Sequence, residues 1–542
     1  MSAEHDADAP AKIPQSPQSL ERSASLAGAA TLTSRILGLA RESVLAAVFG
    51  ASNEMDAFLV ALRLPNLVRD LFAEGAMSAA FVPTFTRHLR SRGKADAWRL
   101  ANNVLTMLIL ISGSLVIFGV VFARPIVTAY AGEYAAVPGK LDLTIQLTRI
   151  TLPFLTLISI AAVVMGMLNS LQHYFLPALS PATFNIASIA CAIGLVPVMP
   201  AVGLPRIMAL AIGAILGGIG QIAIQWPSLR REGFRYKPFL DLGDDGLRRV
   251  LSLMGPGTIG LAATQVNVFV NTLLATQQGT GAVSWLTYAF RLMYLPIGLF
   301  GVSIATALLP HASHHAAAND QAAIRRTVAD GIGLMLAVNI PAMFGLIVLS
   351  EPIAQVLFQR GRFLPSDTAA TAAALRFYAI GLIGYSAARI VSPVFYAINR
   401  NRVPVIVSVA TIALNIAASL TLTRFLSFRG LALGTSIAAL FNGGMLTLLL
   451  GRAIGGIDGR RLSATLFKSI VAASIMAAVA HLSFGWLDAL LGEGSISQIV
   501  ALGSAIALSM AGLAAAATLL RIHEFEGRMR ALVNAIGARL VR

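Results

Sequence analysis

The sequence predicts an all-α polytopic membrane protein with fourteen transmembrane helices, from its composition and its hydropathy pattern. Of 542 residues, 56% are hydrophobic and only 12% are charged, and the mean hydropathy is +0.75. An ordinary soluble domain carries roughly 25% charged residues, so the composition argues against a large water-soluble enzyme. The apolar residues fall in separate runs of about 20, the length that a helix needs to cross a bilayer. These runs lack two-residue alternation and are too long for barrel strands, so the spans are predicted to be helices.

A polar tail precedes the first apolar run. Residues 1–23 are rich in Ala, Pro and Ser and include Glu4, Asp6 and Asp8, which predicts a flexible cytoplasmic tail rather than a cleaved signal peptide. The predicted spans follow at 26–48, 57–85, 103–123, 146–170, 178–199, 205–226, 250–274, 284–309, 328–349, 374–397, 404–423, 430–451, 469–487 and 498–520.

The distribution of Lys and Arg predicts that both termini are cytoplasmic. With the N-terminus inside, 26 of the 41 basic residues fall in inside segments and 8 in outside loops or at the outer ends of spans. Such an excess marks the cytoplasmic side of a membrane protein. The net charge of +16 is therefore mainly a topological signal. In a soluble protein the same charge would suggest nucleic acid, which we do not expect as a partner here.

The other seven basic residues lie within predicted spans, and all seven are arginines. They are Arg35, Arg41, Arg63, Arg69, Arg149, Arg291 and Arg389. An arginine at mid-bilayer costs about 2.5–3.5 kcal/mol on insertion scales, so each must face water, an opposite charge or an anion.

Two interpretations of these arginines remain open. One is structural ion pairing, for which the first two spans offer the following acids: Glu42, Asp56, Asp70 and Glu74. The other is a water-filled cationic cavity that receives an anion, and the excess of bases over acids favours it. The planar guanidinium fork suits phosphate or carboxylate because it binds two oxygens at once. Helix breaks are predicted at Pro65, at Glu74-Gly75 and at Pro296, as is common where backbone lines a cavity.

Segments about 227 residues apart resemble each other, which predicts two parallel six-helix lobes. Arg149 matches Arg376, and Arg63 matches Arg291. Parallel repeats of this kind build transporters with the site at the repeat interface. The predicted domains are the tail at 1–23, an N-terminal lobe at 24–240, a C-terminal lobe at 241–455, and two extra helices with a cytoplasmic C-terminus at 456–542.

Three other patterns carry little functional weight. Gly255–Gly260 satisfies the G-x-G-x-x-G pattern, but no strand precedes it and proline holds its second place, so it does not predict a dinucleotide site. His311, His314 and His315 cluster without an acid or cysteine at ligand spacing, so no metal site is predicted. The single cysteine, Cys191, excludes an internal disulfide.

Several motifs resemble those of the MurJ/MviN family within the MOP (multidrug/oligosaccharidyl-lipid/polysaccharide) exporter superfamily. They are Thr33-Ser-Arg-Ile-Leu-Gly-Leu-Ala-Arg-Glu42, Asp56-Ala-Phe, Leu64-Pro-Asn-Leu-Val-Arg69, Phe72-Ala-Glu-Gly-Ala76, Arg291-Leu-Met-Tyr-Leu-Pro296, Leu309-Pro310 and Phe358-Gln-Arg-Gly-Arg-Phe363. The resemblance covers about residues 24–520. It implies two six-helix lobes plus two extra helices beside a groove for a lipid tail. It also implies outward flipping of lipid II, the undecaprenyl-pyrophosphate-linked peptidoglycan precursor, by alternating access in the bacterial inner membrane.

The resemblance also implies roles for particular residues. Substrate binding is expected at Arg35, Arg41, Arg69 and Arg291, together with Arg63 and Ser34. Gating or charge pairing is expected at Asp56, Glu74 and Glu42. A candidate monovalent-cation site falls at Asn415, Ser419 and Thr435, with Asn267 nearby in the family pattern, and contains no carboxylate.

The resulting hypothesis is a lipid II flippase that has no cofactor and is not an enzyme. Membrane potential or a monovalent cation would drive it, and cell-wall synthesis or division proteins are candidate partners alongside membrane lipids. The alternatives are a flippase of another polyprenyl-linked oligosaccharide, a drug exporter of the superfamily, a membrane-embedded glycosyltransferase and a structural scaffold. A cation exporter should line its cavity with acids, and a glycosyltransferase needs catalytic carboxylates on a sizeable loop. A scaffold has no need of buried arginines.

Overall fold

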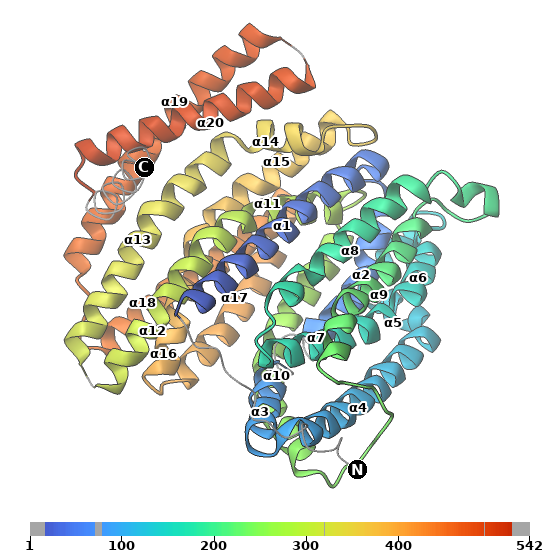
Figure 1. Ribbon diagram of the computed structural model, residues 1–542. Helices are drawn as coiled ribbons and strands as arrows, with labels where there is room; N and C mark the ends of the chain where they lie inside the picture. Colours follow the sequence, from blue (N-terminus) through green and yellow to red (C-terminus); the bar gives the residue numbers. More distant parts are fainter. Residues whose placement is uncertain (1–16, 71–77, 319, 493, 523–542) are drawn as a thin grey trace, which may run out of the picture. The chain divides into compact units, whose positions relative to one another are not determined.

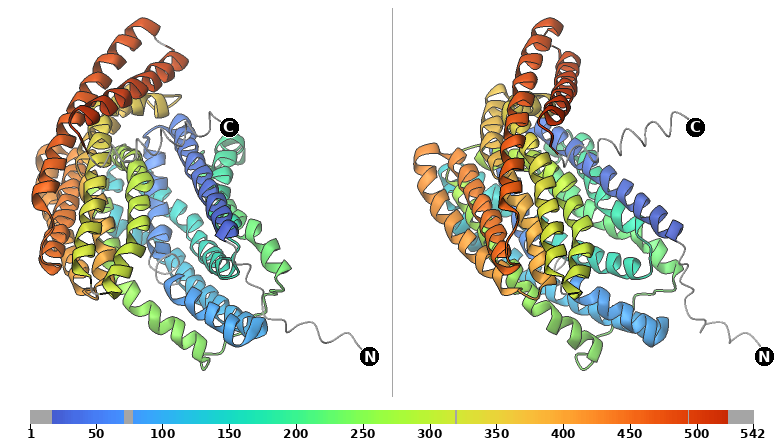
Figure 2. Two further views of the ribbon diagram at one scale, coloured as in Figure 1. Left: turned by 60° about the vertical axis from the view of Figure 1, so that its left-hand side comes forward. Right: turned by 90° about the vertical axis from the view of Figure 1, so that its left-hand side faces the viewer.

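The chain folds into helices joined by turns, with no strand among the residues that the computed structural model describes, 17–70, 78–318, 320–492 and 494–522. It divides into two compact units, Met1–Gly281 and Ala282–Arg542 (Figures 1 and 2). Unit 1 contains α1 (Pro17–Phe49), α2 (Asn53–Arg69), α3 (Ser78–Ser91), α4 (Gly93–Val121), α5 (Ala123–Ala131), the 3₁₀ turn η2 (Gly132–Ala136), α6 (Lys140–Thr151), α7 (Phe154–Ser170), α8 (Phe175–Gly194), the 3₁₀ turn η3 (Met199–Val202), α9 (Met208–Arg231) and α10 (Asp245–Thr276).

Unit 2 contains the remaining helices. They are α11 (Ala282–Pro296), the π-helical turn η4 (Ile297–Gly301), α12 (Val302–Ala317), α13 (Gln321–Val348), α14 (Ser350–Phe358), α15 (Pro365–Ile380), α16 (Leu382–Ala397), α17 (Arg402–Leu426), α18 (Phe428–Ala453), α19 (Gly459–Leu491) and α20 (Ser495–Leu519).

The all-helical membrane class is confirmed, while the count of fourteen spans stays a prediction. Among the described residues, ten helical segments are long and apolar enough to cross a membrane, and the pair α15–α16, bent by 42°, makes an eleventh. The other three predicted spans fall on α1, on α2 with α3, and on α10. α2 is only 17 residues long, and α1 carries charged residues along its length.

The predicted tail ends earlier than expected, because α1 already begins at Pro17. The segment 17–23 contains good helix formers such as Gln, Leu, Glu and Arg, and the proline at its first position is preorganised for a helix. The rest of the tail, 1–16, and the end of the C-terminus, 523–542, lie outside the described residues.

The helix bounds follow the predicted repeat of about 227 residues. α5 and α14 are both nine residues long and begin at Ala123 and Ser350. The α7–α8 turn and the α16–α17 turn contain Gln172 (φ 63°) and Asn399 (φ 58°), two non-glycine residues in the left-handed region. Positive φ is uncommon outside glycine, so its recurrence at equivalent positions supports a structural repeat.

The core of unit 1 brings α3, α4, α7 and α10 together. Phe81, Phe85, Val104 and Met167 are buried there, and Val250 of α10 belongs to the same cluster. This packing is why the compact unit ends at Gly281 and includes α10. The predicted lobe boundary at 240/241 follows the sequence repeat instead and remains a prediction.

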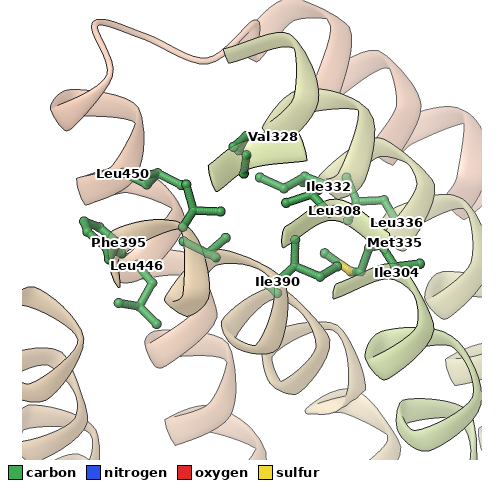
Figure 3. Close-up of a cluster of buried hydrophobic side chains, with 14 of the residues drawn as sticks. Ile304, Leu308, Val328, Ile332, Met335, Leu336, Ile390, Phe395, Leu446 and Leu450 are labelled. Atoms are coloured by element: carbon green, nitrogen blue, oxygen red, sulfur yellow. The ribbon is translucent and has the colours of Figure 1, made fainter. Parts of the chain in front are cut away.

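The core of unit 2 is a cluster between α12, α13, α16 and α18 (Figure 3). Leu308, Ile332, Ile390 and Leu446 are among its buried side chains. α19 and α20 form a hairpin, and α19 packs along α13 (Figure 1).

Candidate functional site

The first polar feature of unit 1 is the face of α1 that packs on α8. Asn185 of α8 donates from Nδ2 to the carbonyl oxygen of Ser34 at 3.0 Å. One turn further, a Cβ at Gly38 would lie 3.6 Å from the same Asn185 amide. The Ser34 backbone therefore fixes α1 against α8, and its predicted role in substrate binding remains a prediction.

Arg41 lies on the same side of α1 and is buried, with 8% of its surface exposed. Its guanidinium forms an ion pair and hydrogen bond with the carboxylate of Glu42, which is 2% exposed. The guanidinium also lies over the ring of Phe184, 5.1 Å from the centroid. Arg41 thus takes part in the packing of α1 on α8, and Glu42 compensates its charge.

Arg35 differs from Arg41 because no acid in the described part of the chain pairs with it. Its side chain is half-buried, and no carboxylate oxygen among the described residues lies within 4.0 Å of the guanidinium. A cation within a predicted membrane span is stabilised by water or by an anion. Of Arg35 and Arg41, Arg35 is therefore the one available to a ligand.

α2 carries two further predicted cavity arginines. Arg69 donates from Nε and Nη2 to Oδ1 of Asp70, at 3.0 and 2.7 Å, and both side chains are partly exposed. Gln265 of α10 donates to the other oxygen of Asp70 at 3.5 Å. Arg63 is exposed and donates from Nε to Oγ1 of Thr272 at 3.2 Å.

The acids of the candidate site have different roles. Asp56 is fully buried and pairs with Lys140 of α6 at 3.1 Å. Its Oδ2 also accepts from the backbone N–H of Gly281 at 2.7 Å. Lys140 lies 3.9 Å from the centroid of the Tyr134 ring, and burial together with the Asp56 carboxylate raises the pKa of Tyr134 far above its usual value. Asp56 is therefore part of a structural pair, and Glu74 lies outside the described residues.

In unit 2, the predicted break after Pro296 is present as the π-helical turn η4. Such turns occur inside helices and are frequent at functional sites. Arg291, one and a half turns earlier on α11, is exposed at the surface of unit 2. Nearby, Arg389 hydrogen-bonds the hydroxyl of Tyr294 and lies over its ring, 5.5 Å from the centroid.

The predicted cation-site residues of unit 2 lie between α17 and α18. Asn415 and Ser419 are fully buried, and Thr435 is 6% exposed. Thr435 donates to the Leu431 carbonyl at 2.8 Å, as a serine or threonine in a helix commonly does. No group of three His, Cys, Asp or Glu side chains suited to a metal occurs among the described residues. Asn267, which was named with these three residues as a candidate for the cation site, lies on α10 in unit 1.

Comparison with known proteins decides the family. A family model described as "Lipid II flippase MurJ" matches residues 45–519. The chain belongs to the MurJ family. A probable lipid II flippase MurJ of Rhizobium meliloti is 34% identical over 508 residues, 92% of each chain. One of Vibrio cholerae is 33% identical over 450 residues, covering 81% of this chain and 84% of the relative. The family consists of flippases, not enzymes.

Solved structures agree with the MurJ assignment. A structure of lipid II flippase MurJ in an inward closed conformation aligns with a TM-score of 0.75 at 26% identity, over 91% of this chain and 99% of that one. A multidrug resistance MATE family transporter of the MOP superfamily, in an inward-facing conformation, aligns with a TM-score of 0.65 at 15% identity, over 78% and 94%. The second likeness shows a shared fold alone.

Sequence reasoning on this MurJ member missed the partners that hold its charged residues. Lys140 reads as an outer-loop cation, but it is 3% exposed and pairs with Asp56. Asn185 and Thr272 are neutral residues in apolar runs, and nothing in their local pattern marks them as partners of α1 and α2. The presence of a polar amide or hydroxyl within an apolar span is the one signal that could have indicated such contacts.

Proposed function

We propose that this chain flips lipid II from the inner to the outer leaflet of the bacterial cytoplasmic membrane. One observation carries the proposal. Arg35 in α1, a helix that the sequence predicts to span the membrane, carries a guanidinium that no acid of the described residues neutralises, whereas Arg41 and Arg69 each have an adjacent carboxylate. An anionic group that enters the membrane-embedded part of the protein would meet this charge.

A pyrophosphate suits such a site chemically. Its oxygens accept charge-assisted hydrogen bonds from guanidinium, which are stronger than those between neutral groups. Arg35, Arg63, Arg69 and Arg291 are the arginines that we assign to pyrophosphate binding. In the alternating-access cycle proposed here, one side of the site closes before the other opens.

The lipid tail would stay in the membrane beside α19 and α20. These helices expose large apolar side chains, including Phe467, Leu482 and Ile496 at 69%, 70% and 79%. The polyprenyl chain is apolar, so contact with such a surface avoids exposing it to water.

The other candidate functions fit these observations less well. A drug exporter for cations needs acids in its cavity, but the described acids of α1 and α2 already hold hydrogen bonds or ion pairs. A glycosyltransferase or a scaffold gives no reason for an uncompensated Arg35. A flippase of another polyprenyl-linked oligosaccharide shares the pyrophosphate chemistry and is tested directly below.

Depletion in living cells distinguishes these substrates. When the chain is depleted, lipid II should accumulate in the inner leaflet, which mass spectrometry of extracted lipid intermediates measures. Re-expression of the chain should reverse the accumulation. Accumulation of a different polyprenyl-linked oligosaccharide, with lipid II unchanged, would contradict the proposed substrate.

We also propose that membrane potential assists transport. A charge that crosses 100 mV changes in free energy by about 2.3 kcal/mol, and an anion moving outward from a negative interior goes downhill. Collapsing the potential in vesicles while keeping the ion gradients should therefore slow flipping. An unchanged rate would contradict this proposal and would favour a monovalent cation as the driving ion. The candidate residues for binding that cation are Asn415, Ser419 and Thr435.

A further inference from the structure

Unit 1 contains a second arginine cluster, away from the arginines of α1 and α2. The end of α3, the α3–α4 turn and the first turns of α10 enclose a pocket of about 570 Å³. Four arginines line it: Arg87, Arg92, Arg248 and Arg249. We call it the α3–α10 pocket. Its segments are close together at one end of unit 1 (Figure 1).

Helices α3 and α10 approach closely at the α3–α10 pocket. A Cβ at Gly246 would lie 3.0 Å from Nε2 of His88 and 2.9 Å from Cδ1 of Leu100. The His88 ring is held from its other side, where Nδ1 lies 2.5 Å from Oδ2 of Asp96. His88 of α3 and Gly246 of α10, which both line the pocket, are therefore packed against each other.

The charge of the pocket is mostly uncompensated. Asp245 is the only acid among the residues that line it. Arg92 lies 4.0 Å from Asp96, at the limit of an ion pair. Among the described residues, Arg87 and Arg249 have no carboxylate oxygen within 4.0 Å.

The position of two arginines on α10 strengthens this argument. Arg248 and Arg249 stand in the first turn or so of the helix, where the helix dipole disfavours cations. Arg248 is held there by a 3.0 Å hydrogen bond from Nε to the Leu242 carbonyl. A bound anion would stabilise both side chains and the amino end of the helix.

The apolar edge of the pocket indicates the kind of anion. Leu253 lines the pocket and is 47% exposed, and Leu242, whose carbonyl accepts from the pocket residue Arg248, is 60% exposed. A free phosphate gains nothing from contact with this apolar edge. A phospholipid, in contrast, carries a phosphate group and apolar acyl chains in the same molecule, so it can contact the arginines and the apolar edge together. Basic pockets at the cytoplasmic ends of membrane helices are suited to acidic lipid head groups.

We propose that the α3–α10 pocket binds the phosphate head group of an acidic phospholipid. The Lys and Arg distribution, which predicts cytoplasmic termini, also predicts that residues 86–102 and 227–249 are inside, and this orientation puts the lipid in the inner leaflet. Binding there would anchor the ends of α3 and α10, which the core of unit 1 joins. The site is separate from the arginines assigned to pyrophosphate, and it does not require the chain to flip any lipid.

The test is lipid binding to the delipidated full chain in detergent, measured by native mass spectrometry. Phosphatidylglycerol should bind more tightly than phosphatidylcholine with the same acyl chains. The double variant Arg87→Gln/Arg249→Gln should weaken phosphatidylglycerol binding roughly 25-fold, from about fivefold for each arginine. The matched control, Arg90→Gln/Arg231→Gln, removes two exposed arginines outside the pocket and should bind as the unchanged chain does.

Three outcomes would overturn the proposal: no preference for phosphatidylglycerol, equal losses in both double variants, or displacement of the lipid by millimolar inorganic phosphate. The last would identify free phosphate as the ligand. Circular dichroism and melting of each variant show that a loss of binding is not a loss of folding. Because the readout is binding, its failure leaves the proposed flippase function untouched.

Discussion

The charged residues of α1 and α2 divide into those that hold the fold together and those available to a ligand. Arg41–Glu42 and Asp56–Lys140 are buried pairs, and Arg35 has no acid partner among the described residues. Sequence alone identified all of these residues except Lys140. The sequence could not tell the structural residues from those available to a ligand. That distinction depends on neighbours in α6 and α8, which are far away in the chain.

The first prediction concerns the Asp56–Lys140 pair. Asp56→Asn should lower the stability of the protein by about 3–5 kcal/mol, because it leaves the Lys140 charge buried without compensation. Thermal unfolding of the purified chain in detergent measures this loss. The double variant Asp56→Asn/Lys140→Met should recover much of it.

A matched control for that pair exists in the same unit. Arg124 and Asp142 form a 2.7 Å ion pair whose side chains are 65% and 61% exposed. Asp142→Asn should change stability by less than about 1 kcal/mol, because solvent screens an exposed pair. Equal losses from Asp56→Asn and Asp142→Asn would argue against a structural role for the buried pair.

At the scale of elements, the apolar runs predict nearly every long helix, but not how runs are subdivided. The short helices α5 and α14 follow α4 and α13 after a single irregular residue. Each is too short to be a span, and its composition continues that of the helix before it. The break at Pro296 could be predicted because proline removes a backbone donor within an apolar run.

The second prediction concerns the close packing of α16 on α18. A Cβ at Gly384 would lie 2.2 Å from the backbone oxygen of Ala439, and one at Gly443 would lie 2.5 Å from the Gly384 oxygen. Gly384→Val should therefore force these helices apart and lower the folded yield. The neighbouring Gly444 has open space around its Cβ position, so Gly444→Val is the control.

Size-exclusion chromatography and melting in detergent measure both glycine variants. The Gly384 variant should lose most of its monodisperse fraction, whereas the Gly444 variant should keep it. Comparable behaviour of the two would show that the close approach of α16 and α18 is not needed for stability.

At the scale of the whole molecule, the sequence predicts an orientation as well as a fold class. The excess of Lys and Arg in alternate loops favours cytoplasmic termini. The helix bounds follow the repeat, so equivalent turns of the two copies should face the same side of the membrane. The boundary between the compact units, at Gly281, differs from the predicted lobe boundary at 240/241. The compact units are defined by contacts between residues, whereas the predicted lobes are defined by the sequence repeat.

The third prediction tests this orientation by cysteine labelling. Cys191 is buried and is the single native cysteine, so Cys191→Ser gives a clean background. In that background, Ala136→Cys should react with a membrane-impermeant maleimide in intact cells. Ser91→Cys should react only after the cells are permeabilised. Both positions are exposed, so the reverse pattern would mean that the chain is inserted the other way round.

The central claim is that membrane-embedded arginines bind the pyrophosphate of lipid II. Its most direct test is flipping of fluorescent lipid II in proteoliposomes, followed by the loss of inner-leaflet fluorophore to an impermeant quencher. Arg35→Ala, Arg69→Ala and Arg291→Ala should each slow flipping at least about tenfold, since a hydrogen bond to a charged group contributes about 1.5–3 kcal/mol. The control variant Arg124→Ala, at an exposed position of α5, should flip at the unchanged rate. Flipping at the unchanged rate by all three arginine variants, with normal insertion and folding, would contradict the claim.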